Sequence, residues 1–217
     1  MKINRRQFVR NLGLGTASLS MGSLISTSSC APSGDSRDKR GKVSDDDQFL
    51  FIGDDIAIAQ TEYGKVQGYL LNHVYTFLGV PYGADTSGKN RFMPPQKPEP
   101  WTDVRPAVFY GNTAPQRMEN RWPNNYGTFA DHWNYWDVSE DCLYLNVWTP
   151  GIADGKKRPV LVWLHGGGFT NGSGIEQDGY HGENISREGD IVFCSINHRL
   201  GPIGFSDLSG VGGEAYK

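Results

Sequence analysis

Residues 160–169 read Val-Leu-Val-Trp-Leu-His-Gly-Gly-Gly-Phe, and this stretch is the most informative part of the chain. Its first five residues form an apolar run that is typical of a strand buried on both faces of a sheet. Gly166, Gly167 and Gly168 follow almost at once, and glycine allows positive φ and leaves only backbone at a turn. Peptide N–H groups in such a turn can stabilise a carbonyl oxygen under attack, as an oxyanion hole does. Gly167 and Gly168 are the predicted donors and Gly166 shapes the turn; a glycine turn without chemistry is the alternative.

Five further segments extend this pattern toward both ends of the chain. They are Thr61–Gly68 (TEYGKVQG), Phe77–Gly83 (FLGVPYG), Arg91–Pro95 (RFMPP), Ser139–Pro150 (SEDCLYLNVWTP) and Ser195–Phe205 (SINHRLGPIGF). In order and spacing they resemble the type-B carboxylesterases, the cholinesterase-like branch of the α/β-hydrolases, over about residues 56–217. The resemblance implies an α/β fold that is incomplete here. It would be the N-terminal part of an α/β-hydrolase, in which a small antiparallel meander leads into a central mixed sheet.

The pattern of apolar residues predicts many strands and few helices in residues 49–217. The predicted meander comprises Ile56–Thr61, Lys65–Leu71 and His73–Leu78. Longer apolar strands are predicted at Leu143–Trp148, Pro159–His165 and Asp190–Asn197, and a helix at Gly182–Glu188. The strand Asp190–Asn197 has no polar face, so we expect it in the centre of the sheet with an open edge beside it. Strands alternating with a helix indicate an α/β domain.

The resemblance also implies an activity. It predicts a serine carboxylic ester hydrolase that works through an acyl-enzyme, takes a small-molecule carboxylic ester and needs no cofactor. Such an enzyme needs a serine in a Gly-x-Ser-x-Gly turn, then an acid and a histidine. Residues 1–217 contain no such turn; Ser206, in the segment Gly204–Leu208, lacks the closing glycine, and we interpret it as inert. The nucleophile, acid and base are therefore expected outside this chain, an N-terminal fragment that is inactive by itself.

Two alternatives to the enzyme stay open at this point. Cholinesterase-like domains also serve as non-catalytic binding or adhesion modules, and a truncated product would have no function at all. The coding sequence past Lys217 would separate them. A Gly-Glu-Ser-Ala-Gly in frame supports the enzyme, and a substituted serine supports the binding module.

The N-terminal residues predict export. Asn4–Arg10 contains paired arginines and precedes an uncharged, weakly apolar stretch, so residues 1–30 resemble a twin-arginine signal peptide. Thr27–Cys30 resembles a lipoprotein processing site, which predicts lipidation and membrane attachment at Cys30; ordinary cleavage is the alternative. The protein is expected to be exported, either to the periplasm or as a membrane-anchored lipoprotein, with secretion into the medium as a further alternative. Residues 31–48 are polar and charged and are predicted to be a flexible linker to the domain at 49–217.

Charge and histidine spacing exclude two other classes of site. The net charge is −3 and the one basic run is Lys156–Arg158, interpreted as a loop tip, so nucleic acid is not an expected partner. The five histidines show no paired metal-ligand spacing, so no metal site is expected. His165 is predicted to shape the oxyanion turn. His198 is interpreted as a packed loop side chain.

Three further expectations come from the resemblance alone. Related proteins commonly pair a cysteine at the position of Cys142 with one about thirty residues upstream, but alanine stands at 114, so Cys142 is expected to be a free buried thiol. An ion pair is expected between Arg91 and Glu140, and Arg199 is expected to pair with an acid in a later helix. Part of the aromatic-rich connection Pro94–Trp136 is expected over the active site, with simple packing onto the sheet as the alternative.

Overall fold

The computed structural model describes residues 49–117 and 137–216. The predicted signal peptide, Cys30, the linker 31–48 and the aromatic stretch Trp122–Trp136 lie outside these residues. The chain divides into two units, Met1–Val43 and Ser44–Lys217, and all the described residues belong to the second. Within the described ranges, no helix has the length and apolar character needed to cross a membrane.

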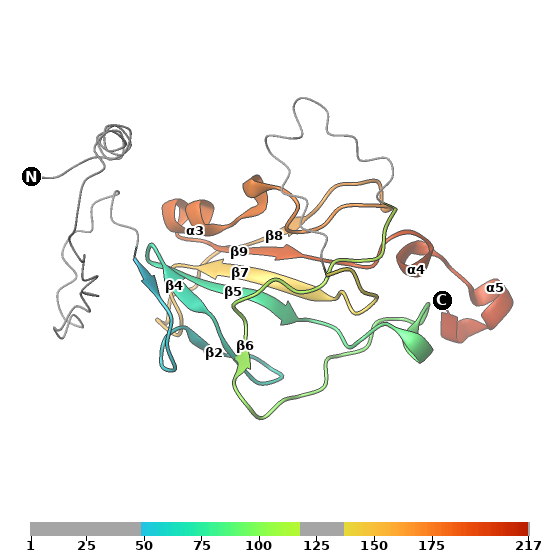
Figure 1. Cartoon of the computed structure of the whole chain (residues 1–217), viewed down its shortest axis with the longest axis horizontal. Coiled ribbons are helices and arrows are strands. Elements are labelled where there is room, and N and C mark those ends of the chain that lie inside the picture. Colours follow the sequence, from blue (N-terminus) through green and yellow to red (C-terminus); the bar gives the residue numbers. More distant parts are fainter. Residues whose placement is uncertain (1–48, 118–136, 217) are drawn as a thin grey trace, which may run out of the picture. The chain divides into compact units, whose positions relative to one another are not determined.

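A six-stranded mixed sheet forms the centre of this unit, in the order β1-β4-β5-β7-β9-β8 (Figure 1). Its strands are β1 Leu50–Phe51, β4 Tyr69–Leu71, β5 Val74–Pro81, β7 Tyr144–Thr149, β8 Val160–Leu164 and β9 Val192–Ile196. Neighbours pair antiparallel except β8 and β9, which are parallel. The predicted long strands are thus confirmed as β7, β8 and β9, and β9 lies between the other two.

The predicted meander is divided between two sheets, which corrects the expectation of one small unit. A second sheet contains β2 Ile58–Gln60, β3 Lys65–Gln67 and β6 Arg105–Pro106, whereas β4 and β5 belong to the central sheet. The predicted strand 65–71 breaks at Gly68, where a Cβ would collide with the carbonyl oxygen of Thr76. The close approach of two backbones at this glycine lets the chain pass from one sheet to the other.

Successive residues of β7 place apolar side chains in different clusters because strand side chains alternate between faces. Val147 packs with Phe77 and Val66 toward the second sheet. Trp148, fully buried, packs with Phe193 on the opposite face. There the helix α3 Glu183–Gly189 contacts β5, β7 and β9.

The helix predicted at Gly182–Glu188 is confirmed as α3, and its fit on the sheet depends on small residues. The Ser186 hydroxyl donates to the carbonyl oxygen of Trp148 at 3.0 Å. Gly182 lies so close to Phe193 and Trp148 that a Cβ there would meet both rings. The other short helices are η1 Gly88–Asn90, η2 Asp178–Tyr180, α4 Gly201–Phe205, α5 Ser209–Gly212 and η3 Glu214–Tyr216.

The apolar strand β8 is exposed, which corrects the prediction that it is buried on both faces. It is the last strand of the sheet, and within residues 49–117 and 137–216 no strand pairs with its outer edge. All five of its side chains are exposed, from 37% for Trp163 to 64% for Leu164. The open apolar edge therefore belongs to β8, whereas the strand expected beside that edge, β9, is buried between β7 and β8.

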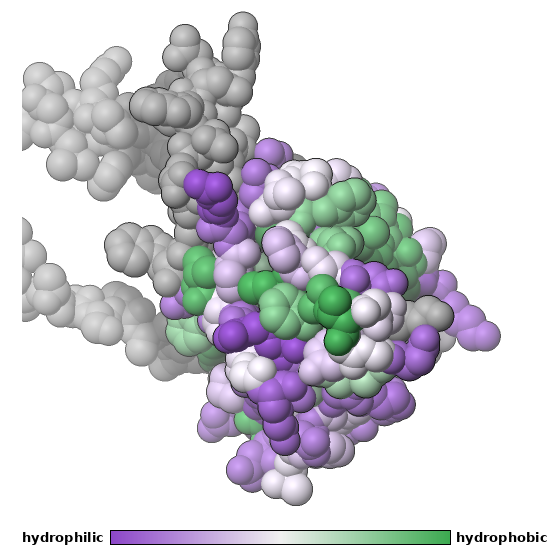
Figure 2. Space-filling model, turned by 90° about the vertical axis from the view of Figure 1, so that its right-hand side faces the viewer, coloured by the Kyte–Doolittle hydropathy of each residue, from purple (hydrophilic) through white to green (hydrophobic). Residues whose placement is uncertain are grey.

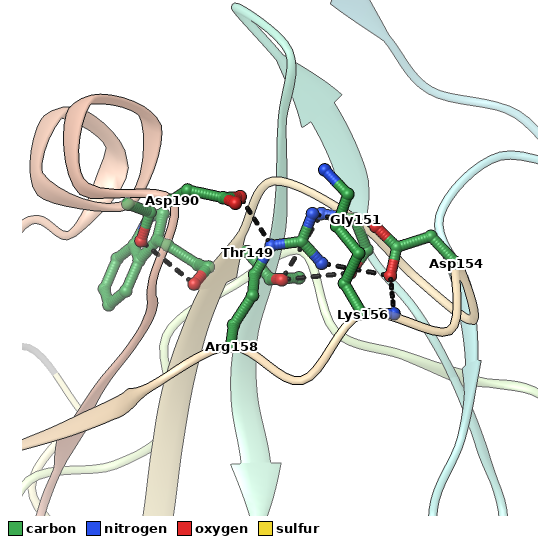
Figure 3. A network of polar contacts seen from close by, with 8 residues as sticks. Thr149, Gly151, Asp154, Lys156, Arg158 and Asp190 are labelled. Atoms are coloured by element: carbon green, nitrogen blue, oxygen red, sulfur yellow. Dashed lines mark hydrogen bonds and ion pairs between the residues drawn. The ribbon is translucent and has the colours of Figure 1, made fainter.

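Arg158 fixes the entrance of β8, which corrects its interpretation as part of a loop tip. Its guanidinium lies between two carboxylates, with Nη2 at 2.7 Å from Asp154 and Nε at 2.7 Å from Asp190 (Figure 3). Only 7% of the Arg158 side chain is exposed. Hydrogen bonds from Arg158 are the main reason that the pKa of Asp154 is lowered to about 2. Arg158 thereby ties the loop before β8 to the turn before β9.

Both described cysteines are free and buried, in keeping with the reading of Cys142. Burial raises the pKa of the Cys142 thiol to about 12 and that of Cys194 to about 11. Only the thiolate reacts with alkylating reagents. Iodoacetamide at pH 8 should therefore label neither of these two cysteines in the native protein and both in the denatured protein. Peptide mass spectrometry measures this. Equal labelling before and after denaturation would contradict the burial described here.

Candidate active site

The three-glycine turn begins just after the end of β8. It lies beside the start of α4, where the Gly201 N–H donates to the Phe169 carbonyl. Gly167 has φ 120° and Gly168 has φ 61°, both in the region that favours glycine. At position 167 a Cβ would also collide with the carbonyl oxygen of Asn171. The backbone path of the turn therefore requires glycine at 167 for two independent reasons.

The turn presents unused N–H donors to its surroundings. The Gly167 carbonyl accepts hydrogen bonds from the N–H groups of Thr170 and Asn171, both at 3.2 Å. In contrast, no acceptor in the described part of the chain takes the N–H of Gly167 or Gly168. Both glycines are exposed. Free, fixed amide donors on an accessible turn are what an oxyanion hole requires.

The turn rests on a buried layer that includes His165 and Gly172. His165 is 8% exposed, and its Nδ1 lies 2.8 Å from the Gly166 carbonyl oxygen. Gly172 makes two hydrogen bonds with Gln116: its N–H donates to Oε1 at 2.8 Å, and its carbonyl accepts from Nε2 at 3.0 Å. A side chain at Gly172 would collide with the Gly166 carbonyl. Gln116 was not identified from the sequence, where no motif marks it.

Asn197 fixes the segment that follows β9 next to the turn. Its side chain is buried, accepts from the Gly174 N–H at 2.8 Å and donates to the Asn112 carbonyl at 3.0 Å. The Tyr82 hydroxyl donates to its backbone carbonyl at 2.7 Å, and burial raises the pKa of this tyrosine. Asn197 stands inside a motif quoted above but had no assigned role.

The other residues singled out in the sequence lie around this layer. Arg91 Nε donates to Glu140 Oε2 at 2.7 Å, so the expected ion pair is present, and Thr86 contacts the Glu140 backbone. Arg199 Nη1 donates to the Met93 carbonyl at 2.8 Å. Ser206 is exposed at the end of α4, and its hydroxyl has no partner within the described residues. Its reading as inert stays a prediction.

A cavity of about 520 Å³ opens beside the turn. Figure 2 shows the face that carries α4 and α5, where apolar residues form a band among hydrophilic ones. The cavity walls are mainly apolar and include Tyr82, Leu143, Phe169, His198 and Phe205. No group of three or more metal-binding side chains occurs among residues 49–117 and 137–216. The site can therefore receive an apolar molecule with its polar oxygen at the glycine turn.

The sequence of the chain is similar to those of known proteins. Residues 55–212 match the model of the carboxylesterase family. Phenmedipham hydrolase of Pseudarthrobacter oxydans is 45% identical over 157 residues, 72% of this chain and 30% of that protein. Para-nitrobenzyl esterase of Bacillus subtilis (strain 168) is 40% identical over 162 residues, 73% of this chain and 30% of that protein.

Solved structures agree with these matches. An esterase from Clostridium hathewayi that can hydrolyse aliphatic aromatic polyesters has a TM-score of 0.69 and 38% identity. This likeness covers 78% of the present chain and 32% of that one. The chain spans about 30% of the length of the two curated relatives described above.

Proposed function

The chain belongs to the carboxylesterase family, and we propose that it supplies the oxyanion-binding part of a serine carboxylic ester hydrolase. The predicted fold class is confirmed, since the mixed sheet matches esterase structures over most of the chain. The observation that carries the proposal is the glycine turn: Gly167 and Gly168 hold free N–H donors, and Gly166 and Gly168 line an apolar cavity.

The geometry supports a defined role in acyl transfer. An ester carbonyl placed in the cavity would direct its oxygen to the N–H groups of Gly167 and Gly168. When a nucleophile attacks the carbonyl carbon, the oxygen becomes negative and these donors hold it more strongly than in the ground state. The tetrahedral adduct then expels the alcohol, and water releases the acid from the acyl-enzyme. Removing one such donor costs about 10²–10³ in kcat in other hydrolases.

We place the nucleophile, acid and base in polypeptide outside residues 1–217. The exposed side chains of β8 support this, because a strand that pairs in parallel is normally covered on both faces. The glycine turn begins directly at the end of β8. A strand added parallel to β8 at its unpaired edge would end beside the turn, where a nucleophile is needed.

The test is an ester hydrolysis assay on two proteins. The full-length gene product that contains these residues should hydrolyse p-nitrophenyl acetate and be labelled by a fluorophosphonate at a serine outside residues 1–217. The 217-residue chain by itself should show no turnover above a heat-treated control, because it lacks a positioned nucleophile. Absence of both turnover and label in folded full-length protein would overturn the proposal and favour a binding module. Turnover by the chain alone that vanishes in Ser206→Ala would show that Ser206 is the nucleophile.

We further propose that the protein is exported through the twin-arginine route and lipidated at Cys30. The paired arginines in Asn4–Arg10 and the small residues before Cys30 support this. In a bacterium with this route, Arg5→Lys with Arg6→Lys should abolish export, measured by fractionation. Incorporation of labelled fatty acid should disappear in Cys30→Ala. Undiminished export of the double variant would contradict the proposal.

A further inference from the structure

Four rings from two separate segments surround the glycine turn. His165 and Phe169 stand at the two ends of the turn, and His198 and Phe205 come from the segment after β9. The His165 and His198 rings are stacked, with centroids 4.4 Å apart and planes 4° apart. His198 meets Phe205 edge-on at 5.7 Å, and Phe205 lies 4.7 Å from Phe169. The rings thus form one continuous series from the start of the turn to its end.

The backbone at Phe169 is held in place by the same segment. Phe169 has φ 64°, a left-handed conformation that a bulky residue adopts only where its surroundings impose it. Its carbonyl accepts a hydrogen bond from the Gly201 N–H at 2.7 Å, and its ring packs on Phe205. A hydrogen bond and a ring contact from one segment therefore act on the residue that ends the turn.

The segment that carries these contacts is itself fixed. Asn197 anchors its beginning through the buried hydrogen bonds described above. α4 then folds back so closely that a Cβ at Gly204 would collide with the backbone of Arg199. These contacts hold the His198 and Phe205 rings against His165 and Phe169 at the two ends of the turn.

We propose that His198 and Phe205 are positioning residues that hold the turn Gly166–Phe169 in the conformation that directs its N–H donors to the substrate. The inference rests on the proposed function. Three consecutive glycines have more conformational freedom than any other tripeptide, so the turn needs external support to stay ordered. Oxyanion stabilisation depends on donors that are fixed before the reaction begins. Contacts at both ends of the turn supply that order.

The rings also line the cavity, and the experiment separates this from positioning. A wall residue changes KM and acts differently on small and large acyl groups, whereas a positioning residue changes kcat for all esters alike. His198→Ala and Phe205→Ala remove one ring each, and Phe205→Leu removes the ring but keeps apolar volume. His198→Phe restores a stacking ring. Phe109→Ala is the matched control, because Phe109 is 81% exposed and lies outside this cavity.

The variants are made in the full-length gene product and assayed with p-nitrophenyl acetate and p-nitrophenyl butyrate. The three ring-removing variants should lower kcat about 10- to 100-fold for both esters, with KM within about twofold. His198→Phe and Phe109→Ala should stay within about threefold of the parent. A change confined to butyrate or to KM, or a His198→Phe variant as slow as His198→Ala, would overturn the proposal.

Hydrogen exchange in the same proteins reports the turn without requiring activity. The amides of Thr170 and Asn171 bond to the Gly167 carbonyl, and that of Gly201 bonds to Phe169, so all three should exchange faster when a ring is removed. The Val192 amide, bonded to Pro159 in the sheet, should be unchanged. If the parent protein has no esterase activity, the proposed function fails, and unchanged exchange at the three turn amides separately overturns the positioning role. Faster exchange there supports it.

Discussion

Residues 49–217, purified by themselves, should self-associate or be only partly ordered. The reason is β8, which presents five exposed apolar side chains at an unpaired sheet edge. Unpaired apolar edges template pairing with other chains. Each large apolar side chain left in water forfeits about 1.5–3 kcal/mol, against a total stability of about 5–15 kcal/mol for a domain. Several such side chains on one strand are therefore a large fraction of the stability.

A charge in the middle of the strand should reduce this association. Val162 is 55% exposed in β8, so Val162→Lys should lower the average mass measured by size-exclusion chromatography with light scattering. Val211→Lys is the matched control. Val211 is 89% exposed in α5, so a lysine there adds the same charge away from the sheet. A monodisperse monomer of the unmodified residues 49–217 with a sharp thermal transition would show that the unit is self-sufficient. That outcome would favour the binding module over an esterase whose nucleophile, acid and base lie outside residues 1–217.

Gly167→Ala should lower kcat/KM for p-nitrophenyl acetate about 10²–10³-fold in the full-length gene product. The new Cβ would collide with the Asn171 carbonyl, and φ 120° is unfavourable for alanine. The turn must then move, and its N–H donors move with it. In the proposed reaction those donors act on the negative oxygen of the transition state, so the loss should fall mainly on kcat.

Gly168→Ala tests the same turn with a smaller perturbation. A Cβ at Gly168 meets no atom within 4 Å, so the cost is limited to the left-handed backbone, about 1–2 kcal/mol, and the loss of activity should be smaller than for Gly167→Ala. Gly210→Ala is the matched control, since it also meets no atom and lies within the helix α5. Equal activity of Gly167→Ala and Gly210→Ala in folded protein would contradict the assignment of the oxyanion turn.

Local patterns were sufficient for most elements of this fold. Apolar runs located β7, β8 and β9 to within two residues at each end, and Gly182–Glu188 was recognised as the helix α3. Such elements follow from short-range periodicity, which is written in neighbouring residues. The break at Gly68 was missed because it depends on the approach of Thr76 from the next strand.

In the candidate site, too, the features that depend on local sequence could be predicted, and those that depend on distant segments could not. The glycine turn was identified from residues 165–169 alone, because positive φ and bare backbone are properties of glycine itself. Gln116 and Asn197 were not identified, since their hydrogen bonds join segments far apart in the chain. The sequence predicts only a packed side chain for His198, because its stacking on His165 depends on how the segment after β9 returns to the turn.

Residue types and their spacing were sufficient to identify the carboxylesterase family, the strand and turn at residues 160–169 and the three glycines of that turn. Only the folded chain shows that β8 lies at an open edge, that Arg158 links two carboxylates, and which residues contact the turn. The physical reason is the range of the interactions. Backbone conformation and apolar periodicity are local properties, whereas strand order, charge pairing and ring stacking arise only when distant segments meet.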